Sequence, residues 1–97
     1  MSAFGGTTTK LMSLSAGEFA DSMSKIGVHQ INADGSRRFD LSPGHVDVNY
    51  APQPGVRLGG LLELPRAVVT INFDGVSDAA RTRFLQIFEM AFQRGGG

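Results

Sequence analysis

The chain has 97 residues, of which 41% are hydrophobic and 19% charged, and its nine basic residues balance its nine acidic ones. This length fits one domain with one core, and the balanced charge disfavours a dedicated nucleic-acid binder, which usually carries a positive surplus. The absence of cysteine excludes disulfides, thiolate metal sites and cysteine nucleophiles. No apolar run reaches the roughly 18–20 residues of a membrane span, and no signal-peptide pattern is present, so the sequence predicts a cytoplasmic protein.

One folded domain between two short ends is expected. Residues 1–9 are small and polar apart from Phe4, which is typical of a flexible leader. Residues 95–97 are three glycines, which do not hold a helix, and they predict a flexible tail. The α+β domain is therefore expected over residues 10–94, with residues 10–14 as a candidate additional edge strand.

Residues 15–26 carry the signals of a helix. Ser15 and Glu18 form a capping box, in which each side chain accepts a hydrogen bond from the other's free backbone N–H. Apolar residues then recur at helical spacing as one stripe: Phe19, Met23 and Ile26. We expect Gly27 to end the helix in the left-handed conformation and Val28 to fold back onto the stripe.

A β-hairpin is predicted for residues 28–41, with its turn at the Asn-Ala-Asp-Gly sequence of residues 32–35. A three-residue loop places Ile31 opposite Arg37, whereas a two-residue loop would send Ile31 to the opposite face from Phe39. Only the three-residue loop keeps the apolar side chains on one face, so we expect that register.

A second turn at residues 42–45 leads to a strand over residues 45–50. The proline and glycine of Ser-Pro-Gly-His suit the two centre positions of the turn. The register that follows sets Phe39 beside Val48. Alternation then directs the apolar side chains of the strand toward the core: Val46, Val48 and Tyr50.

The next segment is rich in proline and glycine. Residues 51–55 contain two prolines and predict a loop, because proline cannot donate a ladder hydrogen bond. A strand is expected over residues 56–62, in which Gly59 and Gly60 indicate a bulge or bend. Pro65 is expected in the following turn.

The last two elements are a strand over residues 67–73 and a helix that Ser77 caps. The helix carries a broad apolar arc over residues 80–93, which predicts that it packs on the sheet. The fold class expected is therefore α+β, a two-layer sandwich. A four- or five-stranded antiparallel meander sheet would have the two helices packed on one face.

Two histidines and nearby aspartates are the candidates for acid–base chemistry. His29 is expected on the core face and His45 on the outer face, which separates the two rings. The predicted register places Asp40 directly opposite Asp47, where paired carboxylates can hold a cation or share a proton unless Arg38 neutralises them. A small enzyme with a His/Asp site is thus one alternative. No motif of a metal, phosphate or serine-nucleophile site is present, so we expect no catalytic residue, no metal and no cofactor.

Another alternative is a small nucleic-acid- or phosphate-binding domain. Its surface would combine arginines of the sheet with one aromatic ring for stacking: Arg38, Tyr50, Arg57 and Arg66. The zero net charge and the absence of tryptophan disfavour it.

A surplus of apolar residues on the outer sheet face supports the main hypothesis. Leu58 and Leu62 alternate with Leu61 along one strand, so leucines face outward whichever way that strand faces, and Val68 lies on the outer face. A second copy or a partner commonly buries such a face or an open sheet edge, unless the loop at residues 51–55 or the leader covers it.

The sequence therefore predicts a non-catalytic protein-interaction module or accessory subunit that self-associates through the outer sheet face or edge. Its interaction surface would contain Leu58, Leu62 and Val68. The expected partner is a second copy of the chain or another protein. Binding to a membrane is not expected.

Overall fold

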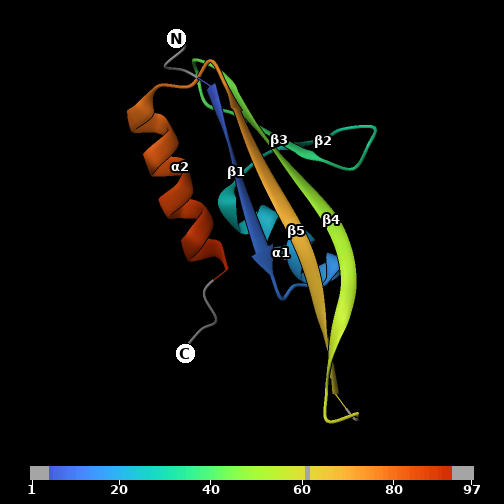
Figure 1. The fold of residues 1–97 in the computed structure, drawn as a ribbon. Helices are drawn as coiled ribbons and strands as arrows, with labels where there is room; N and C mark the ends of the chain where they lie inside the picture. The colour runs from blue at the N-terminus through green and yellow to red at the C-terminus, as the bar shows by residue number, and fades with distance from the viewer. Residues whose placement is uncertain (1–4, 61, 93–97) are drawn as a thin grey trace.

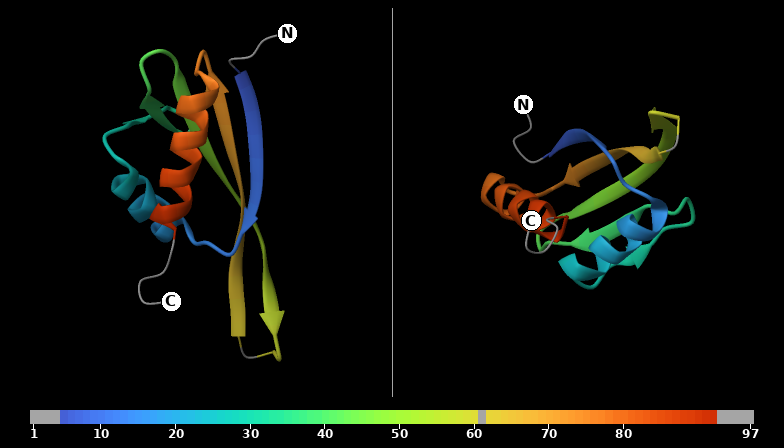
Figure 2. Two further views of the ribbon diagram at one scale, coloured as in Figure 1. Left: turned by 90° about the vertical axis from the view of Figure 1, so that its left-hand side faces the viewer. Right: turned by 90° about the horizontal axis from the view of Figure 1, so that it is seen from below.

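The computed structural model describes residues 5–60 and 62–92, which form two layers (Figure 1). One layer is a five-stranded antiparallel sheet in the order β1 (Gly5–Met12), β5 (Leu62–Asp74), β4 (His45–Leu58), β3 (Arg37–Asp40) and β2 (Gln30–Ile31). Both helices lie on the same face of this sheet, where they share one apolar core with it (Figure 2). The predicted α+β sandwich is confirmed.

The strands are β1 (Gly5–Met12), β2 (Gln30–Ile31), β3 (Arg37–Asp40), β4 (His45–Leu58) and β5 (Leu62–Asp74), and the helices are α1 (Ala16–Ile26) and α2 (Asp78–Ala91). Within the described ranges, no helix has the length and apolar character needed to cross a membrane. The expected edge strand exists as β1, which begins earlier than predicted, so residues 5–9 are strand rather than leader. Residues 1–4 and the predicted tail at residues 95–97 lie outside the described residues.

Helix α1 begins at its predicted cap and ends differently than predicted. The Ser15 hydroxyl accepts a hydrogen bond from the Glu18 backbone N–H, and the Glu18 carboxylate accepts one from the Ser15 N–H, at 3.2 and 3.0 Å. Gly27 has φ +151° and ψ −168°, an extended conformation open to glycine but outside the left-handed helical region. The chain therefore leaves the helix outward, and Val28 is 98% exposed instead of packing on the stripe.

The β2–β3 hairpin has the predicted register. Ile31 pairs with Arg37, and the Asn32 N–H donates to the Ser36 carbonyl at 2.8 Å, which closes a three-residue loop. Ile31 is nevertheless 64% exposed. It lies in a two-residue strand at the margin of the sheet, where no neighbouring strand covers it.

The β3–β4 turn begins one residue earlier than predicted. The Leu41 N–H donates to the Gly44 carbonyl at 3.0 Å, so Ser42 and Pro43 form the loop and Gly44 lies beyond it. Gly44 has φ +85° and its backbone lies directly against Gly75, where a side chain would not fit. Gly44, which was predicted at the centre of the turn, thus allows the backbone there to approach the end of β5 closely.

The earlier turn shifts the β3–β4 register by two residues. Phe39 pairs with Val46 instead of Val48, and Arg38 rather than Asp40 lies opposite Asp47. The predicted pairing of the two aspartates is therefore wrong. Because a shift of two residues keeps every side chain on its face, the predicted layers are unaffected.

β4 and β5 form one long hairpin, and the predictions for this segment are wrong. The predicted loop at residues 51–55 belongs to β4, and Pro65 lies inside β5. The strand expected at residues 56–62 is divided between β4 and β5. Gly59 and Gly60, with φ of +66° and +76°, lie in the turn rather than in a bulge.

The end of this hairpin, residues 53–60 and 62–66, extends beyond both helices and is called the arm (Figure 1). The register with β3 stops at Val48, so among the described residues the rest of β4 has β5 as its only strand neighbour. Proline is tolerated on such an edge, where one side of the backbone makes no ladder bonds. The irregularity between Gln53 and Val56 accommodates Pro54.

The core lies between the helices and the inner face of the sheet. Phe39, Val46 and Val48 are buried beneath the helices, as predicted. The remaining members of this buried cluster come from α1, β5, α2 and the flanking loops: Leu14, Phe19, Met23, Val69, Ile71, Phe73, Val76, Phe84 and Phe88. With the inner face filled, the outward-facing side chains of the sheet are the ones available for binding.

Candidate functional site

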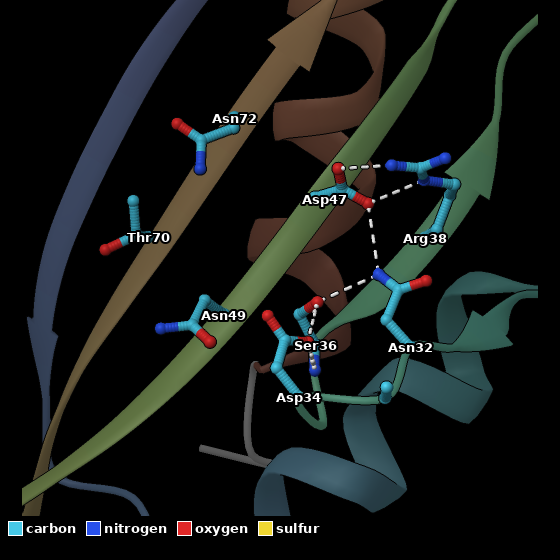
Figure 3. Close-up of a pocket in the computed structure, with 9 residues that line it drawn as sticks. Asn32, Asp34, Ser36, Arg38, Asp47, Asn49, Thr70 and Asn72 are labelled. Carbon is cyan, nitrogen blue, oxygen red and sulfur yellow. Dashed lines mark hydrogen bonds and ion pairs between the residues drawn. The ribbon is translucent and has the colours of Figure 1, made fainter.

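A polar hollow lies on the outer face of the sheet, opposite the helices (Figure 3). It is an open concavity of about 690 Å³. Nine residues line it, and nearly all of them carry polar side chains: Asn32, Ala33, Asp34, Ser36, Arg38, Asp47, Asn49, Thr70 and Asn72.

Strand alternation brings these side chains together. Asp47 pairs with Asn72, and Asn49 pairs with Thr70, across β4 and β5. Residues directly opposite each other in an antiparallel ladder project from the same face, so all four point outward while their chain neighbours fill the core. The β2–β3 loop supplies the remaining wall.

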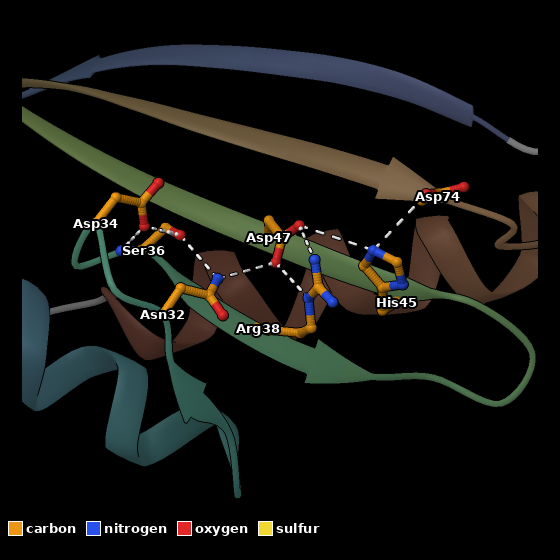
Figure 4. Close-up of polar contacts among 7 residues, drawn as sticks. All are labelled: Asn32, Asp34, Ser36, Arg38, His45, Asp47 and Asp74. Atoms are coloured by element: carbon orange, nitrogen blue, oxygen red, sulfur yellow. Dashed lines mark hydrogen bonds and ion pairs between the residues drawn. The ribbon is translucent and has the colours of Figure 1, made fainter.

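An ion pair between β3 and β4 lies in this hollow (Figure 4). Arg38 Nε donates to Asp47 Oδ1 at 2.9 Å and Arg38 Nη2 donates to Asp47 Oδ2 at 3.0 Å, which is a bidentate contact. The hydrogen bond from Arg38 lowers the pKa of Asp47, and the same contact raises the pKa of Arg38. Asn32 Nδ2 adds a longer hydrogen bond to Asp47 Oδ1, at 3.4 Å.

The β2–β3 loop is held by its own side chains. Asp34 Oδ1 accepts hydrogen bonds from the Ser36 N–H and hydroxyl, at 2.9 and 2.7 Å, and these bonds lower the pKa of Asp34. Asn32 Nδ2 also donates to the Ser36 hydroxyl, at 2.8 Å. Many polar groups of the hollow therefore bind each other, which makes the hollow a structural junction of three strands.

The histidines lie on opposite faces, as expected. His45 Nε2 lies 3.7 Å from a carboxylate oxygen of Asp47 and 3.7 Å from one of Asp74 (Figure 4). The His29 ring stacks near Phe39, with centroids 4.9 Å apart, on the inner side of the sheet. Among the residues that the structure describes, no three His, Cys, Asp or Glu side chains gather in a way that could hold a metal ion.

The four residues of the nucleic-acid alternative do not form one surface. The Tyr50 hydroxyl donates to the Leu14 carbonyl at 3.0 Å, and the Tyr50 ring lies 5.1 Å from the Phe19 ring, on the helix side. Arg38 is bound by an aspartate in the hollow. Arg57 and Arg66 lie in the arm. Tyr50 therefore does not lie on the outer face beside these arginines, where it was expected to stack on a base.

An apolar strip occupies the other half of the outer face. We define it as the outward-facing apolar residues of β1, β4 and β5: Leu11, Ala51, Val56, Leu62, Leu64 and Val68. The β1–β5 and β4–β5 registers place Val68 between Leu11 and Ala51 at the base of the arm. The strip continues past Arg66 into the arm.

Two of the three predicted interaction residues lie at the far end of the arm. Leu58 is directly opposite Leu62 in the β4–β5 ladder. Leu62 and Val68 are an even number of residues apart on β5 and so share the outer face. Leu61, which was expected to point to the opposite face from Leu58 and Leu62, lies outside the described residues.

The sequence also contained signals for residues that were not singled out. Thr70, Asn72 and Asn49 occupy outward positions of strands whose alternation is clear, but their meeting in one hollow depends on the β4–β5 register. Leu11 was missed because its neighbour Val68 lies in a distant part of the chain.

We predict that Asp47→Asn changes how stability depends on pH. Because the pKa of Asp47 is lowered in the folded chain, its ion pair stabilises the fold fully above the ordinary aspartate pKa of about 3.9 and loses that contribution as the pH falls through the lower folded value. The wild-type chain should therefore lose more unfolding free energy than Asp47→Asn between about pH 5 and about pH 3. Urea denaturation at several pH values measures this.

Arg38→Ala is the matched variant, because it removes the cause of the shift and leaves the carboxylate in place. Arg38→Ala should reduce the loss of unfolding free energy between about pH 5 and about pH 3, as Asp47→Asn does. Equal pH slopes in all three proteins would show that the ion pair contributes nothing.

Comparison with known proteins identifies no matching family model, no matching curated protein and no matching solved structure.

Proposed function

We propose that this protein is a non-catalytic interaction module or accessory subunit that self-associates through the outer face or edge of its sheet. The single observation that carries the proposal is the uncovered apolar strip. Leu11 is 59% exposed, Leu62 53% and Leu64 36%, on a face that carries no helix. Apolar residues grouped in this way on a sheet are commonly buried by a partner.

The described residues of the two segments expected to shield this face do not cross it. Residues 51–55 continue β4, and residues 5–9 form β1, so both are part of the sheet. The strip therefore borders solvent along both the body and the arm. A partner that covers it would remove several leucine and valine side chains from water at once.

The arm adds to this argument. It extends the molecule to a longest dimension of 47 Å against 28 and 25 Å for the other two. No helix packs against the residues of the arm (Figure 1). A two-stranded ribbon gains little stability alone, so burial of the arm by a second copy would stabilise it.

The competing functions receive less support. The ionic and amide groups of the polar hollow largely bind each other, which suits a structural role better than catalysis. The arginines of the nucleic-acid alternative are dispersed or paired. We retain the cytoplasm as the proposed compartment, and a second copy as the first partner to test.

The test is the mass in solution of the wild-type chain and of Leu62→Asp, by light scattering after gel filtration. The wild-type mass should exceed the 10.3 kDa of one chain. Where the outer face is the contact, Leu62→Asp should weaken association about tenfold or more, because burying a leucine side chain contributes roughly 1.5–3 kcal/mol and a buried carboxylate adds a cost.

Met90→Asp is the matched control, because Met90 is an exposed apolar residue on α2, 67% exposed, away from the sheet's outer face. It should leave the mass unchanged. An equal response to both substitutions would indicate a nonspecific effect of charge and contradict the proposed surface.

A further inference from the structure

We propose that β1 is the edge through which two copies join, by antiparallel pairing of β1 with β1 of a second copy. This inference rests on the proposed self-association and specifies its geometry. The two five-stranded sheets would become one continuous sheet of ten strands.

β1 is an open edge of unusual accessibility. It pairs with β5 over its eight residues, and no strand of the described part of the chain lies on its other side. In Figure 2 (left) it forms the margin of the sheet, and no described element lies beyond it. A row of unpaired N–H and C=O groups of this length can accept a further strand.

The other free edges of the sheet are protected. β2 at the opposite margin has only two residues, which is too short to support extended pairing. The free side of β4 beyond Val48 contains Pro52 and Pro54, and proline interrupts strand addition. The chain thus blocks two edges and leaves β1 unblocked, since its sequence GGTTTKLM contains no proline.

The charge on β1 also permits pairing with itself. Its one charged side chain is Lys10, whose Nζ lies 2.7 Å from Glu89 Oε2 on α2. That contact neutralises the charge that would otherwise repel a second copy. The centre of the strand consists of three threonines, a residue type that favours strands and forms stabilising cross-strand pairs.

The symmetry of the pairing follows from these residues. An antiparallel pair of identical strands has its two-fold axis perpendicular to the sheet, so the residue on the axis faces its own copy. If Thr8 lies on the axis, Lys10 faces Gly6 of the second copy. If Thr9 lies on the axis, Lys10 faces Thr8. Neither register opposes two lysines.

The same symmetry keeps the helices of both copies on one side of the joined sheet. The outer faces then lie side by side, and the two Leu11 residues flank the junction. Pairing through β1 thus leaves Leu62 exposed at the end of the arm, so Leu62→Asp should leave a β1 dimer intact, whereas it should weaken association through the outer face.

Single cysteines test the inference cleanly, because the chain has none of its own. Thr8→Cys and Thr9→Cys test contact between the β1 edges, and Leu62→Cys tests contact between the arms. Val28→Cys lies at a loop residue that is 98% exposed, and it measures linkage by random collision. Directly opposed residues of a ladder have Cβ atoms about 4.5–5.5 Å apart, close to the span of a disulfide. Mild oxidation and non-reducing electrophoresis should show a linked dimer for Thr8→Cys or Thr9→Cys and not for Val28→Cys.

The outcomes separate this inference from the proposed function. A wild-type mass above 10.3 kDa, with linkage only at Leu62→Cys, would overturn pairing through β1 and leave association through the outer face intact. A monomeric wild-type chain would overturn both. Thr9→Lys gives a second readout at an exposed position, and it should abolish the dimer peak while circular dichroism retains the wild-type spectrum.

Discussion

Phe88→Ala is expected to lower the free energy of unfolding by about 3–5 kcal/mol. Phe88 is 1% exposed and lies where α2 meets the sheet. Its ring centroid is 4.7 Å from that of Phe92 and 6.4 Å from that of Phe84. Truncation would remove the ring from this aromatic row and leave a cavity that the sheet, held by its ladders, cannot collapse to fill.

The neighbouring residue provides the control. Ile87 lies on the same helix but is 37% exposed. Ile87→Ala should therefore cost less than about 1 kcal/mol, because much of its side chain already contacts water. Urea denaturation followed by circular dichroism compares the two variants. Similar losses in both would contradict the assigned orientation of α2.

Gly44→Ala is expected to lower the free energy of unfolding by about 2–5 kcal/mol. Two effects add: an alanine at φ +85° costs roughly 1–2 kcal/mol, and steric overlap in a packed region costs a further 1–3 kcal/mol. The added Cβ would lie 2.5 Å from the carbonyl carbon and oxygen of Gly75 and against the carbonyl of Asp74. These are backbone atoms, so they cannot move aside as a flexible side chain would.

Gly17→Ala is the matched control and should have the opposite sign. Gly17 lies in α1, and a Cβ there would have no atom within 4 Å apart from its chain neighbours and the backbone of its own helix. Alanine should stabilise the helix by about 0.5–1 kcal/mol, because it loses less backbone entropy than glycine. Thermal denaturation of both variants gives the comparison. A gain in stability for Gly44→Ala would contradict the close approach of the β3–β4 turn to β5.

Local chemistry made much of the fold predictable. The capping box at Ser15 and the cap at Ser77 depend on neighbours within three residues, and both helices begin where these caps predict. The assignment of strand residues to the inner or outer face also holds despite an error in the predicted turn. The turn at Gly44 was misassigned by one residue, yet the resulting register error is even, so Phe39 and Val46 remain in the core.

The arm could not be predicted in the same way. A proline excludes a strand only if its missing N–H would have had a partner, and that depends on which strands lie beside it. Pro52 lies where β4 has a single neighbour, so the ladder with β5 survives. Gly59 and Gly60 are compatible with either a bulge or a turn until their pairing partners are known.

In the candidate site too, features set by local alternation were predictable and features set by strand register were not. Val68 was assigned to the outer face from alternation alone, whereas Leu62 was expected on a separate strand whose facing stayed open; in the structure both lie on the outer face of β5. The polar hollow was not anticipated, because it depends on a register across three strands. The predicted turn paired Asp47 with Asp40, whereas the observed one pairs it with Arg38 and converts a repulsive contact into an ion pair.

The most direct test of the central claim, that this sheet joins two copies of the chain, is sedimentation equilibrium of the unmodified protein over a dilution series. A self-associating chain gives a mass that rises with concentration toward twice 10.3 kDa. A mass of 10.3 kDa at every concentration would contradict the claim.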